Sequence, residues 1–221
     1  MISSEFPLKV SPSLLAADYG YLADAAISAE QGGANLLHID YMDGHYVPNI
    51  SFGIDLIPAL KKRVNIPLEA HLMISNPEDR IEDFIRVKPD YITIQEDVPK
   101  DVRSILNKIR KSGIKPGLAI NPDRPLSAIY NYLHLIDYLL ILGVFPGFGG
   151  QKFIRDTLKK MEEAHNFRIK NNLKYDIAVD GGVNLLTARN IVKTGANILV
   201  AGTAIFGQEN IKEAIENLKK L

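Results

Sequence analysis

The chain has 221 residues, of which 46% are hydrophobic and 24% charged, the composition of a globular protein rather than a disordered or fibrous one. Lys and Arg number 26 and Asp and Glu number 26, a balance that argues against nucleic acid or an anionic membrane as partner. Without cysteine, disulfides, zinc–thiolate sites and thiol nucleophiles are excluded. No apolar run approaches the roughly 20 residues of a membrane span, and the first eight residues lack the basic-then-apolar order of a signal peptide. We expect a soluble, cytoplasmic protein with a single domain over residues 1–221.

Eight short apolar runs alternate with longer amphipathic stretches. Short runs bounded by Gly, Asn or Pro are typical of parallel strands buried on both faces. The predicted strands are Leu8–Ser11, Leu36–Asp40, Leu68–His71, Tyr91–Ile94, Gly117–Ile120, Tyr138–Leu142, Asp176–Val179 and Ile198–Ala201. The predicted helices are Tyr19–Gln31, Asp55–Arg63, Pro77–Val87, Asp101–Lys111, Pro125–Leu133, Ile154–Asn171, Leu185–Lys193 and Glu209–Lys220.

Local signals mark some helix ends. Asn76 before Pro77 predicts an N-cap followed by a first helical residue, because an amide oxygen can accept from the free N–H groups and proline lacks one. Gly113 and Gly195 follow predicted helices, where glycine readily takes the left-handed conformation that ends a helix.

Eight β-then-α units without a linker fit either a closed barrel or a large doubly wound sheet. About 220 residues suits eight compact units of a barrel. The first predicted strand leads into Ser11-Pro12-Ser13-Leu14-Leu15, which is not the glycine-rich loop of a dinucleotide-binding sheet. The sequence therefore favours the α/β class and a (β/α)8 TIM barrel, with its chemistry at the C-terminal ends of the strands.

Four polar side chains lie at or beside predicted strand ends. His38 and Asp40 end the second strand, and residues i and i+2 of a strand share a face. His71 ends the third strand and Asp180 follows the seventh. Each alone has a plainer interpretation, a hydrogen-bonded core histidine or a turn-forming aspartate. Together they predict a site for one divalent metal ion, for which Zn, Fe(II), Mn or Co suits the mixed nitrogen and oxygen ligands better than Ca or Mg.

Glycines follow the last three predicted strands. They occur in Pro146-Gly147-Phe148-Gly149-Gly150-Gln151, in Gly181-Gly182 and in Gly202-Thr203. Any one of these could be a simple turn, but three successive loops favour a phosphate site at the end of a barrel. No Lys or Arg precedes Lys152 in these loops, so backbone amides would hold the anion.

Longer motifs surround these positions. They are the segments 12–18, 38–49, 70–73, 117–122, 146–153, 179–183 and 200–206, which include the strings M-D-G-x-x-V-P-N and P-G-F-G-G-Q. Through these segments, which are spread along the whole sequence, the chain resembles the ribulose-phosphate 3-epimerase family. Both strings are rarely met outside this family and its close sugar-phosphate relatives.

The resemblance implies a metal-dependent isomerase that epimerises carbon 3 of a ketose phosphate. The leading expectation is the conversion of D-ribulose 5-phosphate to D-xylulose 5-phosphate, and the resemblance also suggests a homo-oligomer. The implied metal ligands are His38, Asp40, His71 and Asp180, of which Asp40 and Asp180 also transfer protons. The implied substrate contacts are Ser13, His71, Gly147, Phe148, Gly149, Gly150, Asp180, Gly181, Gly182, Gly202 and Thr203. Met42 and Met73 match thioethers that crowd the reacting carbons in the family.

Chemistry agrees with these roles. Inverting a carbon beside a ketone needs proton removal from one face and proton return on the other, which two carboxylates can divide between them. A metal ion would stabilise the enediolate as a Lewis acid, and uncharged methionines would keep it dry.

The chain departs from the family pattern around the sugar. Gln95 stands where the family usually has a histidine, and could either replace its hydrogen bond or mark a shifted pocket. Leu142 and Phe145 replace a methionine and a polar residue, and Thr203 replaces a serine. The metal quartet is intact, which favours the same reaction class and argues against a non-catalytic sugar-phosphate binder. The changed walls nevertheless leave that binder and an allulose-6-phosphate 3-epimerase as alternatives. A phosphosugar aldolase or decarboxylase is disfavoured, because no lysine lies at a predicted strand end.

Overall fold

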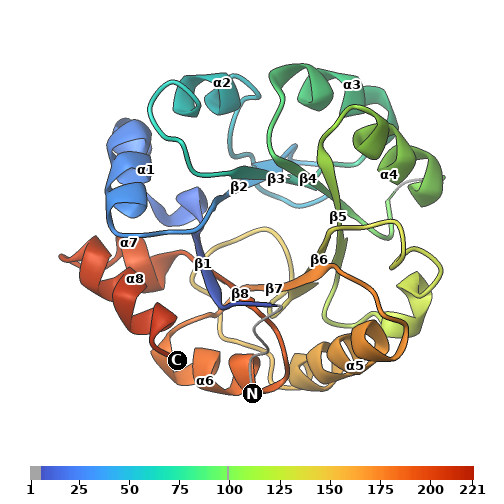
Figure 1. The fold of residues 1–221 in the computed structure, drawn as a ribbon. Coiled ribbons are helices and arrows are strands. Elements are labelled where there is room, and N and C mark those ends of the chain that lie inside the picture. Colours follow the sequence, from blue (N-terminus) through green and yellow to red (C-terminus); the bar gives the residue numbers. More distant parts are fainter. Residues whose placement is uncertain (1–5, 99) are drawn as a thin grey trace.

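Eight parallel strands form one sheet that curls into a barrel (Figure 1). The computed structural model describes residues 6–98 and 100–221, so residues 1–5 and 99 of the predicted domain lie outside the described residues. The strands are β1 (Lys9–Pro12), β2 (Leu37–Met42), β3 (Leu68–Met73), β4 (Tyr91–Gln95), β5 (Lys115–Ile120), β6 (Tyr138–Leu142), β7 (Asp176–Asp180) and β8 (Ile198–Ala201). They pair in the order β1-β8-β7-β6-β5-β4-β3-β2. An isolated parallel bridge between Ser13 and His38 joins β1 to β2, and the predicted TIM barrel is confirmed.

Helices surround this barrel (Figure 1). The α-helices are α1 (Leu22–Gln31), α2 (Leu56–Leu60), α3 (Pro77–Val87), α4 (Val102–Lys111), α5 (Thr157–Lys170), α6 (Leu185–Lys193), α7 (Thr203–Phe206) and α8 (Ile211–Lys219). Within the described residues there are also the short 3-10 helices η1 (Leu14–Ala16), η2 (Tyr19–Tyr21) and η3 (Leu126–Ile129). No helix within 6–98 and 100–221 has the length and apolar character that crossing a membrane requires.

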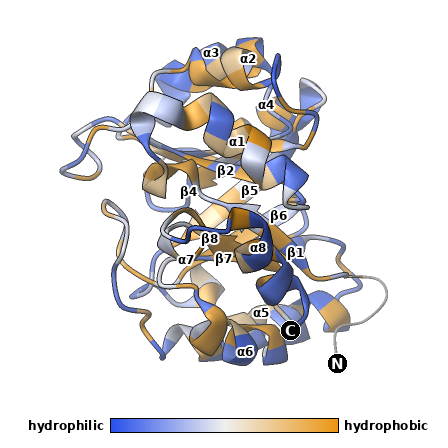
Figure 2. Cartoon of the chain, turned by 90° about the vertical axis from the view of Figure 1, so that its left-hand side faces the viewer, coloured by the Kyte–Doolittle hydropathy of each residue, from blue (hydrophilic) through white to orange (hydrophobic). Residues whose placement is uncertain are grey.

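Side-chain alternation along the strands divides the apolar core into two parts. In β2, Leu37, Ile39 and Tyr41 belong to the large cluster between strands and helices. A second cluster, which includes Leu140 of β6 and Val200 of β8, fills the barrel itself. Figure 2 shows the resulting pattern, with hydrophobic colours along the central strands and mixed colours on the helices around them. The intervening residues of β2 are therefore free to face the interior.

One predicted helix is wrong. The stretch Pro125–Leu133 is not an α-helix, since only Leu126–Ile129 forms η3. Its backbone bonds join residues three apart, as from Ala128 N to Pro125 O at 3.1 Å, and the same spacing repeats from Tyr132 N to Ile129 O at 2.8 Å. Such successive i to i+3 turns are tighter than an α-helix and do not propagate into one.

The predicted cap of α3 is only half right. Asn76 and Pro77 hold the N-cap and first-turn positions, but the Asn76 side chain makes no capping bond. Its Nδ2 instead lies 3.3 Å from Asp79 Oδ2. The four-residue α7 was not predicted, because one turn is too short to show a helical period.

Candidate active site

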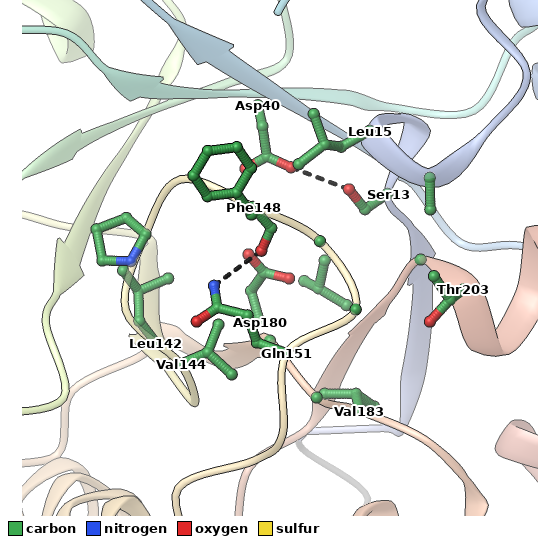
Figure 3. A pocket seen from close by; sticks show the side chains of 18 of the residues that line it. Ser13, Leu15, Asp40, Leu142, Val144, Phe148, Gln151, Asp180, Val183 and Thr203 are labelled. Carbon is green, nitrogen blue, oxygen red and sulfur yellow. Dashed lines mark hydrogen bonds between the residues drawn. The ribbon is translucent and has the colours of Figure 1, made fainter. Parts of the chain in front are cut away.

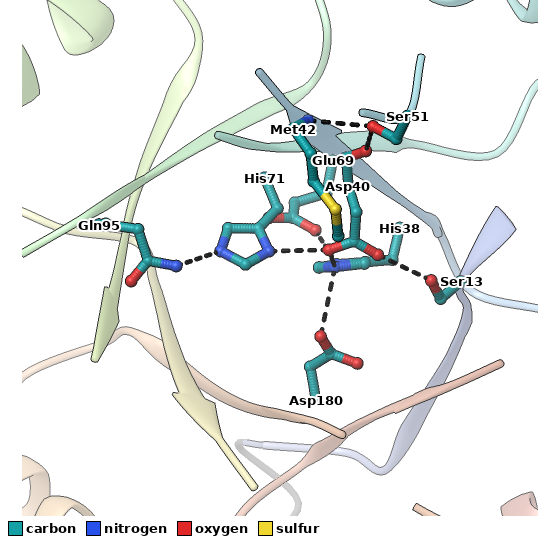
Figure 4. Close-up of polar contacts among 9 residues, drawn as sticks. All are labelled: Ser13, His38, Asp40, Met42, Ser51, Glu69, His71, Gln95 and Asp180. Carbon is teal, nitrogen blue, oxygen red and sulfur yellow. Dashed lines mark hydrogen bonds and ion pairs between the residues drawn. The ribbon is translucent and has the colours of Figure 1, made fainter. Parts of the chain in front are cut away.

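The four predicted metal ligands meet at the C-terminal mouth of the barrel (Figure 4). They come from β2, β3 and β7, and one ligand atom from each of His38, Asp40, His71 and Asp180 lies within 4.8 Å of the other three. Both histidines are fully buried and Asp40 nearly so, while 21% of the Asp180 side chain is exposed. The predicted convergence of the quartet is therefore present in the fold.

Asp40 is the centre of this cluster. Its Oδ1 lies 2.9 Å from His38 Nε2 and also 2.9 Å from His71 Nδ1. Its Oδ2 accepts a hydrogen bond of 2.9 Å from Ser13 Oγ. Asp180 reaches the cluster from the opposite side of the barrel, with its Oδ2 3.8 Å from His38 Nε2. The two ring nitrogens and the two carboxylates thus face a common centre.

Each histidine is held from behind by a second side chain. His38 Nδ1 is in ion-pair contact with the fully buried Glu69 carboxylate. His71 Nε2 lies 2.8 Å from Nε2 of Gln95, whose side chain is also buried (Figure 4). The sequence analysis missed Glu69, although its position two residues before His71 on β3 places both on the same face.

Negative charge exceeds positive charge in this cluster. Burial alone would lower the pKa of His38, but Asp40 and Glu69 raise it well above its ordinary value. Burial works toward a higher pKa for Asp40, yet the charge and hydrogen bonds of His38 and His71 hold it well below its usual range. Burial and then the charge of Asp40 raise the pKa of Asp180 to about 6. Three carboxylates around two imidazoles are an environment that favours an added cation.

The donor set fits a divalent metal ion. Two imidazole nitrogens and two carboxylate oxygens are ligands of Zn, Fe(II), Mn and Co, and outer carboxylate or amide partners commonly orient such histidines. Gln95 Oε1 is buried without a hydrogen-bond partner among the described residues, so the outer contact has an unused acceptor. The residues present could hold one ion at the quartet.

A cavity of about 250 Å³ opens directly above the quartet (Figure 3). Asp40 and Asp180 project into it, whereas the fully buried rings of His38 and His71 do not line it. The predicted contact residues that line the cavity are Ser13, Gly147, Phe148, Gly149, Gly150, Asp180, Gly181, Gly182, Gly202 and Thr203, together with Met42 and Met73. Leu15, Val183 and Asn184 also line it and were not predicted.

The loop between β6 and α5 forms one wall of the cavity. Gln151 Nε2 donates to the carbonyls of Phe145 and Phe148, both at 2.8 Å, and so closes the loop on itself. Asn49 Nδ2 donates 2.8 Å to the carbonyl of Gly147 and ties the loop to the segment after β2. Phe148 lines the cavity and remains 56% exposed (Figure 3).

The far end of the cavity is lined by backbone rather than cations. No lysine or arginine occurs among the described residues that line it. A Cβ on Gly182, whose φ is +68°, would come within 2.6 Å of Phe153 N, and a Cβ on Gly202 would come within 2.9 Å of Ala16 Cβ. Glycine therefore lets these loops approach closely enough for their amides to surround a small anion.

Apolar side chains border the end of the cavity next to the quartet. Met42, Met73 and Val47 form a small buried cluster, against which Leu15 packs. Leu142 and Phe145, which depart from the family pattern, both line the cavity. These two departures thus lie on the cavity wall, and Leu142 lies opposite Asp180 in the β6–β7 ladder.

Known proteins match the chain over nearly its full length. The sequence model described as the ribulose-phosphate 3 epimerase family matches residues 9–206. A ribulose-phosphate 3-epimerase of Methanocaldococcus jannaschii is 41% identical over 213 residues, which cover 96% of this chain and 90% of the relative. The enzyme of the same name from Bacillus subtilis is 38% identical, with coverage of 96% and 98%. Among solved structures, orotidine 5'-phosphate decarboxylase from Pyrococcus horikoshii superposes with a TM-score of 0.69 over 96% of this chain and 97% of its own, at 15% identity, which supports the fold alone.

Proposed function

Because the chain belongs to the ribulose-phosphate 3-epimerase family, whose members are carbohydrate epimerases, we propose that it interconverts D-ribulose 5-phosphate and D-xylulose 5-phosphate with one divalent metal ion. The observation that carries the proposal is the meeting of His38, Asp40, His71 and Asp180 at the floor of a cavity with a glycine-lined far end. That arrangement offers a metal site, two proton-transfer groups and an anion site in one enclosure.

His38, Asp40, His71 and Asp180 are the proposed ligands, through His38 Nε2, His71 Nδ1 and one oxygen of each aspartate. A divalent ion held there would act as a Lewis acid on the oxygens next to the reacting carbon. Ser13 fixes the Asp40 carboxylate by a hydrogen bond at Oδ2, so one aspartate oxygen faces the histidines while the other is held toward β1.

Asp40 and Asp180 are the proposed acid and base. One carboxylate takes the proton from carbon 3 of the ketose and leaves an enediolate, and the other, protonated at the start, returns a proton to the opposite face. The bond broken and the bond formed are both C–H at the same carbon, so no redox partner is needed. Asp40 from β2 and Asp180 from β7 approach from opposite sides of the mouth, which supports the division of labour (Figure 3). The buried Met42 and Met73 exclude water above them.

The phosphate is proposed to bind at the glycine-lined end, on amides of Gly182, Gly202 and Thr203, with Gly147 to Gly150 covering it. Binding energy from a group remote from carbon 3 then fixes the sugar between the two aspartates.

The test is a substrate panel with purified protein, measured in deuterated water with and without a chelator. We expect turnover of ribulose 5-phosphate that the chelator removes, one solvent deuteron at carbon 3 of the product, and near-complete loss of turnover in Asp180→Asn. An Asp180→Asn enzyme of wild-type activity would refute the two-aspartate scheme.

A hexose phosphate is the second candidate substrate. Leu142 and Phe145, which line the cavity and differ from the family pattern, are the observation that favours allulose 6-phosphate. A larger kcat/KM for allulose 6-phosphate than for ribulose 5-phosphate in the same panel would support it. Metal binding without turnover on either sugar would instead indicate a non-catalytic binder.

We further propose that the protein acts in the cytoplasm as a homo-oligomer on a small-molecule substrate, and that it binds no nucleic acid. The net charge of zero supports the exclusion of nucleic acid as a partner. Light scattering of the purified chain would give the oligomeric state.

A further inference from the structure

We infer that Gln95 is a positioning residue for the metal centre, which turns its carboxamide to follow the tautomer of His71. The inference rests on the proposed function, since it concerns the metal ion placed at the quartet. It is carried by the contact of 2.8 Å between Gln95 Nε2 and His71 Nε2, together with the buried, unpartnered Oε1 of the same amide in the described part of the chain.

The contacts of His71 identify the nitrogen that would bind the ion. Nδ1 lies 2.9 Å from Asp40 Oδ1, the atom that also meets His38 Nε2, so Nδ1 faces the common centre. Nε2 points the other way, to Gln95 on β4 (Figure 4). The ring therefore has one nitrogen for the ion and one for the glutamine.

A neutral imidazole carries a single proton, and the nitrogen that holds it decides whether Gln95 must donate or accept a hydrogen bond. Without an ion, His71 Nδ1 donates to Asp40, and Nε2 accepts a hydrogen bond from the Gln95 amide nitrogen, as the structure has it. With an ion on Nδ1, the proton must sit on Nε2, which then requires an acceptor. A half-turn of the carboxamide exchanges its nitrogen and oxygen and presents Oε1, which has no other partner.

Few side chains can serve both states at this position. Glutamate can only accept, so it would favour the tautomer that binds the ion, and methionine can neither accept nor donate a strong hydrogen bond. Outer hydrogen bonds of this kind typically change metal affinity about 10- to 100-fold when removed. His38 has a different arrangement, because the Glu69 carboxylate at its Nδ1 accepts in either state.

The experiment measures Co²⁺ affinity of the full chain by competition with a chelator. We expect Gln95→Met to weaken binding about 10- to 100-fold, and Gln95→Glu, which keeps the acceptor, to bind at least as tightly as the wild type. Thr93→Val is the matched control, because Thr93 lies opposite His71 in the β3–β4 ladder and its hydroxyl has no hydrogen-bond partner among the described residues. Its affinity should equal that of the wild type.

A second readout separates positioning from packing. In the proton NMR spectrum of the Co²⁺ protein, the exchangeable ring protons of His38 and His71 are shifted by the paramagnetic ion. In Gln95→Met, the chemical shift of the His71 ring proton should change and its exchange with solvent should become faster. The His38 ring proton, which faces Glu69, should be unaffected and serves as internal control.

Three results would overturn the inference. Equal Co²⁺ affinity of Gln95→Met and the wild type overturns it, because the lost hydrogen bond would then not matter. Equal weakening in Gln95→Met and Gln95→Glu overturns it too, because shape and not the acceptor would then matter. If the wild type itself binds no Co²⁺, the metal of the proposed function fails as well, a result distinct from the other two.

Discussion

The metal-free protein should become more stable when Asp180 loses its charge. Burial and the neighbouring Asp40 carboxylate raise the pKa of Asp180 from 3.8 to about 6. At about 1.36 kcal/mol for each pKa unit, keeping this carboxylate ionised in the folded chain costs up to about 3 kcal/mol. Asparagine removes the charge but leaves a polar group, so we expect Asp180→Asn to raise the free energy of unfolding by about 1–3 kcal/mol at neutral pH.

The sign of the pH dependence is fixed by linkage. A carboxyl with a raised folded-state pKa favours the folded chain at low pH, where both states are protonated, and its cost grows as pH rises between the unfolded and folded values. The gain in Asp180→Asn should therefore be full above about pH 6 and vanish near about pH 4.

Urea unfolding of the chelated proteins across this pH range is the assay. Glu209→Gln, which changes an exposed carboxylate in the loop before α8, is the matched control and should leave stability unchanged. An Asp180→Asn protein no more stable than the wild type at neutral pH, or a gain independent of pH, would refute the reasoning.

Three further predictions concern the mouth of the barrel. Partial burial is outweighed by hydrogen bonds from Ser75, Tyr46 and His45, which lower the pKa of Asp43 to about 2. The stabilisation that this carboxylate gives is therefore present above about pH 4 and lost as pH falls through about 2, and urea midpoints of Asp43→Asn should fall less steeply over that range. Asn49→Ala removes the hydrogen bond to Gly147, worth about 0.5–1.5 kcal/mol, and should raise KM about two- to tenfold with kcat retained in steady-state assays. Metal at about 100 times its Kd should stabilise the wild type by about 2.7 kcal/mol, and thermal melts of His71→Gln should show no such gain.

Much of this fold could be predicted from the sequence. The apolar runs predicted all eight strands within two residues at either end, and the helices Pro77–Val87 and Leu185–Lys193 match α3 and α6. The motif resemblance predicted the family and the isomerase class, and both are confirmed. Alternation along β2 placed His38 and Asp40 on one face, which the structure also shows.

Other features depended on contacts between distant segments. Glu69 and Gln95 touch the histidines only because β2, β3 and β4 lie side by side, and spacing within each strand does not reveal partners across strands. The tight turns at Leu126–Ile129 form where the chain must pass closely over the core, with Leu126 and Ile129 both buried. Local periodicity cannot distinguish such turns from one helical turn.

The bridge between Ser13 and His38 affects how easily the barrel opens. Each of the other neighbouring pairs of strands is held by a ladder of at least three residues. β1 and β2 are joined by one bridge, which includes a candidate metal ligand, and by the hydrogen bonds of Val10 with Asn35 just before β2. Separation of β1 from β2 would move Ser13 away from Asp40 and disturb the quartet, while the other strand ladders stay intact. A metal ion bound by side chains of β2, β3 and β7 would stabilise the barrel next to this pair of strands. Loss of the ion and opening of the barrel between β1 and β2 would therefore occur together.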